Sequence, residues 1–533
     1  MSKPGRAPPA PLQTVLPVST NASPPDRCDL LIVGGGINGA GIARDAAGRG
    51  LSVVLCEKDD LGSHTSSAST KLIHGGLRYL EHYEFGMVRK SLIEREVLLR
   101  AAPHIIRPMR FVMTHDPSMR PAWLIRMGIL LYDHLARREV LPGSEAIRLR
   151  HHPAGVPLRP EFTRGFVYSD GWVDDARLVL LNVRDAADHG ACVMTRTRCA
   201  DARREADGWH ASLEGPDGRR SEVRARVLVN AAGPWAGTFL RDQVHEPVGR
   251  HLRLVKGSHI VVPRMFDHPL SYIFQCPDKR IIFAIPYEDR FTLVGTTDVE
   301  YRGDPGAPAI TADEVEYLCR MIGHYFQRPI RPADVVWSFS GVRPLLDDES
   351  SDPSAISRDY TLELDTNGPA LLSVWGGKIT TFRRLGEEAV DKLLPALGER
   401  RAPWTHDAPL PGGDLSTVIG APSRPDLDFE RFCEHMQRAV PFLAPDLVRR
   451  YARAYGTRVS EFLDPAGGLS AMGHEVAPGV FEAELNHLVS REWAREPEDI
   501  LWRRTKLGLV LSAGQRASIA AWMDAGHPTP RAG

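Results

Sequence analysis

The sequence predicts an α/β fold, with a dinucleotide-binding domain that begins near the N-terminus and a helical region from about residue 412. Three observations support this prediction: a strand–turn–helix–strand pattern built around a glycine-rich turn, several later strand-like apolar segments, and a change to helical periodicity near the C-terminus. With 533 residues, 43% hydrophobic and 25% charged, the composition is that of a globular protein of two or three domains. The net charge of −1 provides no overall field that would attract nucleic acid, so we expect no such partner.

The glycine-rich turn lies within LIVGGGINGAGIARDAAGRGLSVVLCEK, residues 31–58. An apolar run leads into glycines at GxGxxG spacing, and a helix rich in small residues follows. One glycine makes the tight turn, a second lets the backbone approach a pyrophosphate, and a third lets helix and strand pack closely. The helix N-terminus offers free N–H groups and a positive dipole end to phosphates. The cofactor-binding residues predicted here are Gly34, Gly36, Ile37, Asn38, Gly39 and Glu57.

Glu57 closes the second strand, 18 residues after Gly39. Its carboxylate can accept hydrogen bonds from both ribose hydroxyls and disfavours a 2′-phosphate, which argues against NADP. The motif alone does not separate FAD from NAD. FAD is favoured because the motif lies close to the N-terminus, has no second complete copy, and is followed by the strand VLVNAAG, which ends at Gly233. That strand resembles the one that returns beside the adenine half in glutathione-reductase-like flavoproteins.

A hydroxyl-rich loop follows in SHTSSASTKLIHGGLRYLEHYEF, residues 63–85. Its hydroxyls and backbone N–H groups can serve a pyrophosphate or a flavin ring. The alternative is a solvated loop with no ligand. The cofactor-binding residues predicted in this loop are Ser66, Ser67, Ser69, Lys71, His74 and Gly76.

Many segments, in the same order along the chain, resemble the FAD-dependent sn-glycerol-3-phosphate dehydrogenases of the aerobic, quinone-reducing type. The resemblance runs from about Asp29 to about Met523. The segments that carry it include GGGINGAGIARDAAGRGLSVVLCEKDDL, TSSASTKLIHGGLRYLEHYEF, GFVYSDGWVDDARLV, NAAGPW, KGSHIVVP, GTTDVEY, SGVRPL, SRDYTL and GGKITTFR.

The resemblance implies a glutathione-reductase-like FAD domain of the Rossmann type, an interleaved antiparallel substrate-domain sheet, and a C-terminal α-helical domain. We expect a disordered N-terminal tail at 1–27, the two interleaved domains at 28–405, and the helical domain at 412–533. The apolar runs on either side of YEDR predict a hairpin. In FEAELNHLVSREW, an apolar helical face is predicted from Phe481, Leu485, Leu488, Val489 and Trp493.

The implied reaction oxidises the secondary alcohol of glycerol 3-phosphate, with a hydride passing to the flavin. A phosphate dianion calls for arginine, whose fork donates two parallel hydrogen bonds. We predict substrate binding by Arg78, Tyr79, Arg343 and Arg358, where the alternative for each arginine is a surface ion pair. His259 in KGSHIVV is the first candidate for the base, and His74 is the second.

A reduced flavin carries negative charge that needs stabilisation. WGGKITTFRRLGEEAV supplies glycines for close backbone approach, a lysine, and two threonines at a predicted helix start. The alternative is a glycine turn with a helix cap and no ligand. The predicted residues are Gly377, Lys378, Ile379 and Thr380, with Lys378 grouped with His259 and Arg343 as catalytic.

Family members of this type pass electrons to membrane quinone, which implies contact with a membrane surface at the inner face of the cytoplasmic membrane. RPAWLIRMGILLYDHLARR, residues 120–138, has apolar residues at helical spacing and basic flanks, as an interfacial helix has. A buried core helix is the alternative. We also consider a homodimer, an oxidase that uses oxygen, and an inactive flavin-binding scaffold. No metal is expected.

Overall fold

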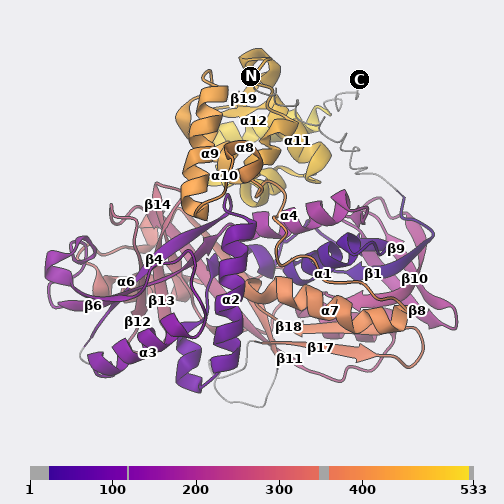
Figure 1. The fold of residues 1–533 in the computed structure, drawn as a ribbon, viewed down its shortest axis with the longest axis horizontal. Helices are drawn as coiled ribbons and strands as arrows, with labels where there is room; N and C mark the ends of the chain where they lie inside the picture. Colours follow the sequence, from indigo (N-terminus) through magenta and orange to yellow (C-terminus); the bar gives the residue numbers. More distant parts are fainter. Residues whose placement is uncertain (1–22, 117–118, 347–358, 527–533) are drawn as a thin grey trace, which may run out of the picture.

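The computed structural model describes residues 23–116, 119–346 and 359–526 (Figure 1). An eight-stranded sheet forms the nucleotide-binding domain, and its main path is β17-β18-β10-β1-β2-β7. The strands are β1 Arg27–Val33, β2 Val53–Cys56, β7 Cys192–Met194, β8 Arg198–Glu205, β9 Gly208–Glu214, β10 Arg220–Asn230, β17 Tyr360–Asp365 and β18 Leu371–Gly376. Helices α1 (Ile37–Gly48), α4 (Asp175–Asp188) and α7 (Phe382–Leu397) pack on this sheet through one hydrophobic core.

The first strand and the VLVNAAG strand are neighbours in this sheet. β1 runs parallel to both β2 and β10, with Leu30 opposite Val227. VLVNAAG, in β10, therefore returns directly beside the strand that leads into the glycine-rich turn. The segments where these strands meet, residues 30–33, 53–56 and 227–230, are buried because hydrophobic cores pack on both faces of the sheet.

The glycine-rich turn depends on a very close backbone approach. Gly34 has a φ of +114°, and a Cβ there would lie 2.4 Å from the carbonyl oxygen of Ala231. A Cβ on Gly39 would lie 2.0 Å from the carbonyl oxygen of Gly34. Neither position has room for a side chain, so α1 begins directly against the ends of β1 and β10.

A second sheet of ten strands forms the other half of the interleaved region. Its main path is β15-β11-β14-β13-β12-β4-β6-β3, with β16 beside β11 and β5 beside β6. Most neighbours are antiparallel, as predicted, and YEDR joins β13 to β14 in a hairpin. The strands are β3 Leu72–Ile73, β4 Ile106–Thr114, β5 Glu145–Arg148, β6 Arg164–Val173, β11 Leu252–Pro263, β12 Ser271–Gln275, β13 Ile281–Tyr287, β14 Phe291–Gly295, β15 Val299–Glu300 and β16 Trp337–Leu346.

Three further helices accompany this sheet. α6 (Ala312–Tyr325) packs into a core formed by one face of the sheet, and α2 (Phe85–Ala101) and α3 (Ala122–His134) lie on the other side. Figure 1 shows α2 between the two sheets and α3 at the edge of the molecule. α2 is therefore central to the molecule, whereas α3 presents one face to solvent.

The C-terminal domain is helical, as predicted, and has its own hydrophobic core. Figure 1 shows it as a separate group of orange and yellow helices above the two sheets. Its elements are α8 Ser416–Ile419, α9 Pro425–Ala439, α10 Pro445–Tyr455, α11 Glu482–Arg491, α12 Ala513–Asp524 and the short strands β19 Glu475–Ala477 and β20 Val480–Phe481.

The apolar face predicted around α11 was too long. Phe481 precedes the helix as its N-cap residue, and Trp493 lies beyond the helix with a φ of +55°. Leu485 and Leu488 pack in the C-terminal core, whereas Trp493 packs in the core of the nucleotide-binding domain. The chain reverses direction after the helix, which sends the indole ring to the other domain.

Buried ion pairs hold the C-terminal domain on the nucleotide-binding domain. Arg504 donates to Asp60 at 2.7 Å, and both side chains are almost fully buried. Arg177 of α4 pairs with Glu492 in the same way. Because charges in a buried contact are stable only when they are paired, each partner depends on the other.

We expect Asp60→Ala to lower the stability of the holoenzyme by about 3–5 kcal/mol, because Arg504 would stay buried without its carboxylate. The measurement is the free energy of unfolding in urea. The matched control is Asp217→Ala, which removes an exposed pair with Arg219 and should have no measurable effect. Equal effects of the two changes would contradict the assigned role of Asp60.

Candidate active site

A cavity of about 1070 Å³ lies where loops of the two sheets meet. Its walls come from the glycine-rich turn, the hydroxyl-rich loop, β11, β16 and the turn after β18. Residues predicted from separate parts of the sequence are brought together here. Those that line the cavity are Gly34, Gly36, Ile37, Asn38, Glu57, Ser66, Ser69, His74, Gly76, Arg78, Tyr79, Gly233, His259, Arg343, Gly377, Lys378 and Ile379.

Four predicted residues lie behind the cavity wall. Gly39 packs against the glycine-rich turn, and Thr380 is buried, where its hydroxyl accepts a hydrogen bond from the backbone N–H of His74 at 3.2 Å. Ser67 and Lys71 line a smaller neighbouring cavity instead. Arg358 lies outside the described residues.

Lys71 makes a buried ion pair instead of facing the large cavity. Its Nζ lies 2.6 Å from Asp175 at the start of α4, and both side chains are almost inaccessible. The backbone N–H and the hydroxyl of Ser69 donate to the other oxygen of the same carboxylate, at 3.1 and 2.7 Å. Asp175 therefore anchors the hydroxyl-rich loop to α4.

One end of the cavity has the features of a nucleotide site. The hydroxyl of Ser66 accepts a hydrogen bond from the backbone N–H of Ile37 at 3.0 Å, so the loop contacts the first turn of α1. Glu57 accepts hydrogen bonds from the backbone N–H groups of Gly35 and Asp59, at 2.7 and 2.9 Å. Burial raises the pKa of Glu57, and the two N–H groups oppose that shift.

Asn38 connects α1 to the turn after β18. Its Nδ2 donates to the carbonyl oxygen of Gly376 at 3.1 Å. Its Oδ1 is buried and accepts no hydrogen bond from any described residue. Because a buried polar atom without a partner is costly, this acceptor fits a hydrogen-bond donor on a ligand in the cavity.

His259 lies at the other end of the cavity, on β11. Only 2% of the residue is exposed, and its ring stacks on Phe339 of β16 with the ring centres 4.8 Å apart. Its Nε2 lies 3.0 Å from the hydroxyl of Thr70. Burial, followed by the charges of Lys71 and Arg343, lowers the pKa of His259 to about 3, so the imidazole is neutral at physiological pH.

Arg343 extends from β16 over the same face of the sheet as His259. Its Nη1 lies 2.7 Å from Asp298, and its Nη2 donates to the carbonyl oxygen of Thr297 at 3.0 Å. A Cβ on Gly257 would lie 2.3 Å from Nη2, so the absence of a side chain at Gly257 makes room for the guanidinium.

Lys378 adds a further positive charge to the cavity wall. Its Nζ lies 4.0 Å from the centre of the Tyr79 ring and 3.0 Å from the sulfur of Met87. Arg78 and Tyr79 belong to the short helix η2 (Leu77–His82), which begins after Gly76 with a φ of +80°. Two predicted substrate-binding residues and a predicted catalytic residue therefore adjoin one another.

This geometry agrees with family comparisons. The family model described as "FAD dependent oxidoreductase" matches residues 29–383, and "C-terminal domain of alpha-glycerophosphate oxidase" matches residues 403–524. A glycerol-3-phosphate dehydrogenase from Pseudomonas aeruginosa is 51% identical over 502 residues, which cover 94% of this chain and 96% of that protein. The chain belongs to the family of FAD-dependent glycerol-3-phosphate dehydrogenases.

Two other curated relatives of this dehydrogenase-family chain are nearly as similar. The aerobic glycerol-3-phosphate dehydrogenase of Escherichia coli K12 is 50% identical over 93% of this chain and 97% of that protein. A D-erythritol 1-phosphate dehydrogenase from Brucella abortus is 49% identical over 94% of this chain and 98% of that protein. The family therefore includes enzymes named for two different polyol phosphates.

A solved structure supports the fold and the cofactor. The glycerol-3-phosphate dehydrogenase of Bacillus halodurans, determined in complex with FAD, matches with a TM-score of 0.73 and 27% identity. The match covers 95% of this chain and 92% of that one. The cofactor of this family member is FAD, as the sequence predicted.

Several residues that shape the cavity had no role predicted from the sequence. Asp298 lies in GTTDVEY and Gly257 in KGSHIVVP, two segments that were recognised only as family motifs. Asp175 lies in GFVYSDGWVDDARLV, and its contact with the loop spans more than 100 residues. In the sequence, the carboxylates of Asp298 and Asp175 and the glycine at 257 were the only signs of a role. A carboxylate or a glycine does not show which residue it contacts in the fold.

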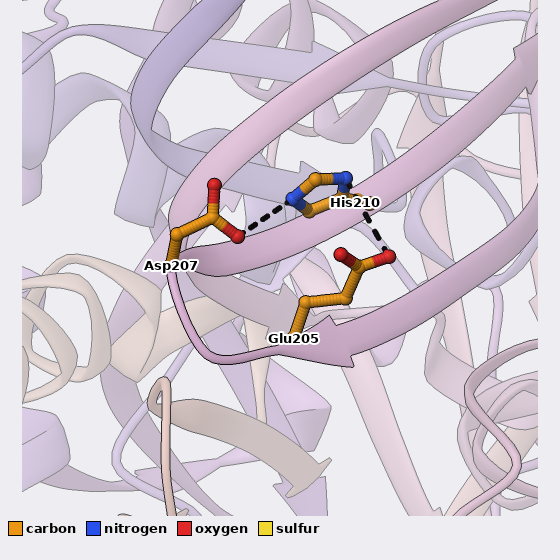
Figure 2. Close-up of side chains that lie close together, drawn as sticks. All are labelled: Glu205, Asp207 and His210. Atoms are coloured by element: carbon orange, nitrogen blue, oxygen red, sulfur yellow. Dashed lines mark hydrogen bonds and ion pairs between the residues drawn. The ribbon is translucent and has the colours of Figure 1, made fainter.

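Among the described residues, one cluster brings together side chains of the types that bind metal ions. It does not line the large cavity. Figure 2 shows Glu205, Asp207 and His210 at the hairpin between β8 and β9. His210 already pairs with Asp207 at 2.9 Å and Glu205 at 3.6 Å, and Arg224 lies 3.5 Å from Asp207. The acidic groups thus already have hydrogen-bonding or charged partners, and the expectation of no metal stays a prediction.

We expect Gly257→Ala to weaken the binding of glycerol 3-phosphate, the compound in the relatives' names, about tenfold, with the FAD content unchanged. The added methyl would displace the guanidinium of Arg343 from its position beside Asp298. Substrate titrations and flavin absorbance measure the two quantities. Gly323→Ala in α6, where no atom lies within 4 Å of the new Cβ, is the matched control and should leave the affinity unchanged. Normal affinity in Gly257→Ala would contradict this account of the clamp.

Proposed function

We propose that this enzyme oxidises sn-glycerol 3-phosphate to dihydroxyacetone phosphate, with hydride transfer to FAD and onward transfer of electrons to membrane quinone. One observation carries the proposal. Arg343, Lys378, Arg78 and His259 line the same cavity as the nucleotide-binding end at Gly36 and Glu57. A phosphorylated alcohol and a flavin can therefore occupy one continuous site.

The residues at the nucleotide end fit FAD. The first turn of α1 offers N–H groups to a pyrophosphate, and Glu57 lies where the ribose hydroxyls are expected. Asn38 Oδ1 is a buried acceptor that a bound ligand would satisfy. When bound, FAD supplies the acceptor for the hydride.

Arg343 is the residue best suited to bind the phosphate. Its planar fork can donate two hydrogen bonds to a dianion and remains charged. In the structure, Asp298 forms an ion pair with this fork, and a bound phosphate would replace the carboxylate. Lys378 and Arg78 add positive charge to the wall of the same cavity.

His259 is proposed as the base. It is neutral, so its imidazole has a lone pair that can take the proton of the alcohol. Burial, followed by the charges of Lys71 and Arg343, lowers its pKa to about 3, which is low for a base. A phosphate dianion on Arg343 would oppose the effect of these two charges and raise the pKa of His259.

The relative from Brucella abortus makes a second substrate worth testing. It is named for D-erythritol 1-phosphate, which also joins a phosphate to a secondary alcohol, and it is 49% identical to this chain. The charged end of the cavity suits both compounds, since it recognises the phosphate. Glycerol 3-phosphate is favoured because the relatives at 50–51% identity carry its name.

An open apolar face on α3 supports the proposal of a membrane partner. Trp123 is 68% and Met127 57% exposed, and Leu124 and Leu131 lie on the same face. The alternative of a buried core helix therefore does not hold for this face. Exposed basic residues, Arg120 and Arg137, flank the helix, which suits an anionic lipid surface.

The same face adjoins the cavity. Leu124, Met127 and Leu131 of α3 line the cavity that contains Lys378 and His259. A lipid-soluble quinone could reach the cofactor from the membrane by this side, without passing through water. Among the described residues, no helix combines the length and apolar character needed to cross a bilayer. We therefore propose peripheral attachment at the inner face of the cytoplasmic membrane.

We expect glycerol 3-phosphate to bleach the flavin absorbance of the purified holoenzyme under anaerobic conditions. Arg343→Ala should raise the substrate concentration needed for half-maximal bleaching by 100-fold or more, since losing a charge-assisted bidentate contact costs about 3 kcal/mol. FAD content should not change. D-erythritol 1-phosphate is run in parallel. A flavin that stays yellow with glycerol 3-phosphate would rule out the proposed substrate.

Reoxidation of the reduced enzyme then distinguishes quinone from oxygen as the electron acceptor. Reoxidation by a short-chain quinone, faster than by oxygen and without stoichiometric peroxide, is the expected result. Rapid peroxide formation would identify an oxidase instead. If neither polyol phosphate bleaches the flavin, the protein is better described as an inactive flavin-binding scaffold.

We expect the double change Trp123→Ser with Met127→Ser to weaken binding to vesicles of phosphatidylcholine and phosphatidylglycerol by tenfold or more, because each exposed apolar side chain contributes about 1–2 kcal/mol when buried in lipid. Co-sedimentation measures the binding. The control is Val156→Ser with Val510→Ser, which removes exposed apolar residues elsewhere on the surface. Equal loss in both double variants would exclude α3 as the membrane face.

A further inference from the structure

We propose that Thr70 is a catalytic residue whose hydroxyl carries the proton of the substrate alcohol to His259. The inference rests on the oxidation proposed above and adds a residue to it. Thr70 and His259 both line the large cavity, and Thr70 Oγ1 lies 3.0 Å from His259 Nε2.

The two nitrogens of the His259 ring differ in their surroundings. Each imidazole nitrogen makes one hydrogen bond in the plane of the ring. The single position on Nε2 is taken by Thr70. Nδ1 is buried and has no hydrogen-bond partner among the described residues. A substrate hydroxyl therefore reaches the basic nitrogen through Thr70 and not beside it.

The His259 ring cannot easily turn. Phe339 stacks on it at an angle of 13° between the ring planes. On the neighbouring strand β14, a Cβ at Gly295 would lie 2.2 Å from Cδ2 of His259, so this edge of the ring lies against the backbone. Exchanging Nδ1 for Nε2 would require the packing of both neighbours to change.

Thr70 is itself held in place. Its neighbours on both sides, Ser69 and Lys71, bind the buried carboxylate of Asp175. Lys71 has a φ of +61°, a backbone conformation that few non-glycine residues adopt. The Thr70 hydroxyl is therefore presented to the cavity by a chain segment fixed at two adjacent points.

The proposed step transfers one hydride and two protons. The C2–H bond of the alcohol breaks and its electron pair leaves with the hydrogen as hydride to the bound cofactor, so the alcohol is oxidised to the ketone. The O–H proton moves to Thr70 Oγ1 while the proton of Thr70 moves to His259 Nε2. Thr70 ends as a neutral hydroxyl, and His259 carries the proton. Burial, together with the charges of Lys71 and Arg343, holds the pKa of His259 low, so the imidazole is neutral before it takes the proton.

The test uses the holoenzyme and three variants. Thr70→Val preserves the shape of the side chain without its hydroxyl, and Thr70→Ser retains the hydroxyl. Thr292→Val is the control: this threonine is fully buried on β14, and its hydroxyl accepts only a structural hydrogen bond, from the N–H of Met265 at 3.1 Å. The measured quantity is the rate of flavin bleaching by saturating glycerol 3-phosphate after rapid anaerobic mixing.

We expect Thr70→Val to slow bleaching by about 100- to 1,000-fold, within the range of a lost proton-transfer catalyst. Thr70→Ser should stay within about fivefold of the wild type, and Thr292→Val should match it. Calorimetric binding of dihydroxyacetone phosphate should weaken no more than about tenfold in Thr70→Val, since one neutral hydrogen bond is lost. The slow variant would then be one that still binds.

The solvent isotope effect gives an independent readout. Two protons move together in the wild type, so the rate should depend nonlinearly on the deuterium fraction of the water. That curvature should disappear in Thr70→Val. A Thr70→Val enzyme that bleaches at the wild-type rate would overturn the relay, as would a Thr70→Ser enzyme that is as slow as Thr70→Val. A wild-type enzyme that does not bleach would overturn the proposed function instead.

Discussion

The buried carboxylate of Asp175 is the contact on which both ends of the cavity depend. It binds Ser69 and Lys71, and so fixes the hydroxyl-rich loop to the start of α4. That loop provides Ser66 to the first turn of α1 and Thr70 to His259. A charge so deeply buried is stable only with its partners in place. One ion pair thereby sets the distance between the nucleotide end and the substrate end.

The C-terminal domain strengthens this arrangement from behind. Lys506 lies 3.3 Å from Asp174, the residue before Asp175, and Arg504 binds Asp60, three residues after Glu57. Among its described residues, the helical domain contributes none to the wall of the large cavity. Its contacts nevertheless end on the segments that position both ends of that cavity. The two family matches, one for each part of the chain, therefore describe parts that depend on each other physically.

Local patterns predicted the parts of the structure that depend on neighbours in the sequence. The glycine-rich turn, the strand VLVNAAG, the YEDR hairpin and the helical C-terminal domain are all present, because periodicity and glycine spacing act over a few residues. Lys71 was assigned to the cofactor because it lies in a hydroxyl-rich loop, whereas its partner Asp175 is 104 residues away. Trp493 fitted the helical spacing of α11, but a reversal of the chain places it in another core. A single sequence does not specify such long-range pairings.

The pairing of Arg343 with Asp298 gives the site a threshold for anions. Any anion that enters must displace a carboxylate already 2.7 Å from the guanidinium. A small monovalent anion gains little over that carboxylate, whereas a dianion brings twice the charge to the guanidinium. The site therefore selects by charge as well as by shape. Chloride or a monocarboxylate would leave the Arg343–Asp298 pair in place.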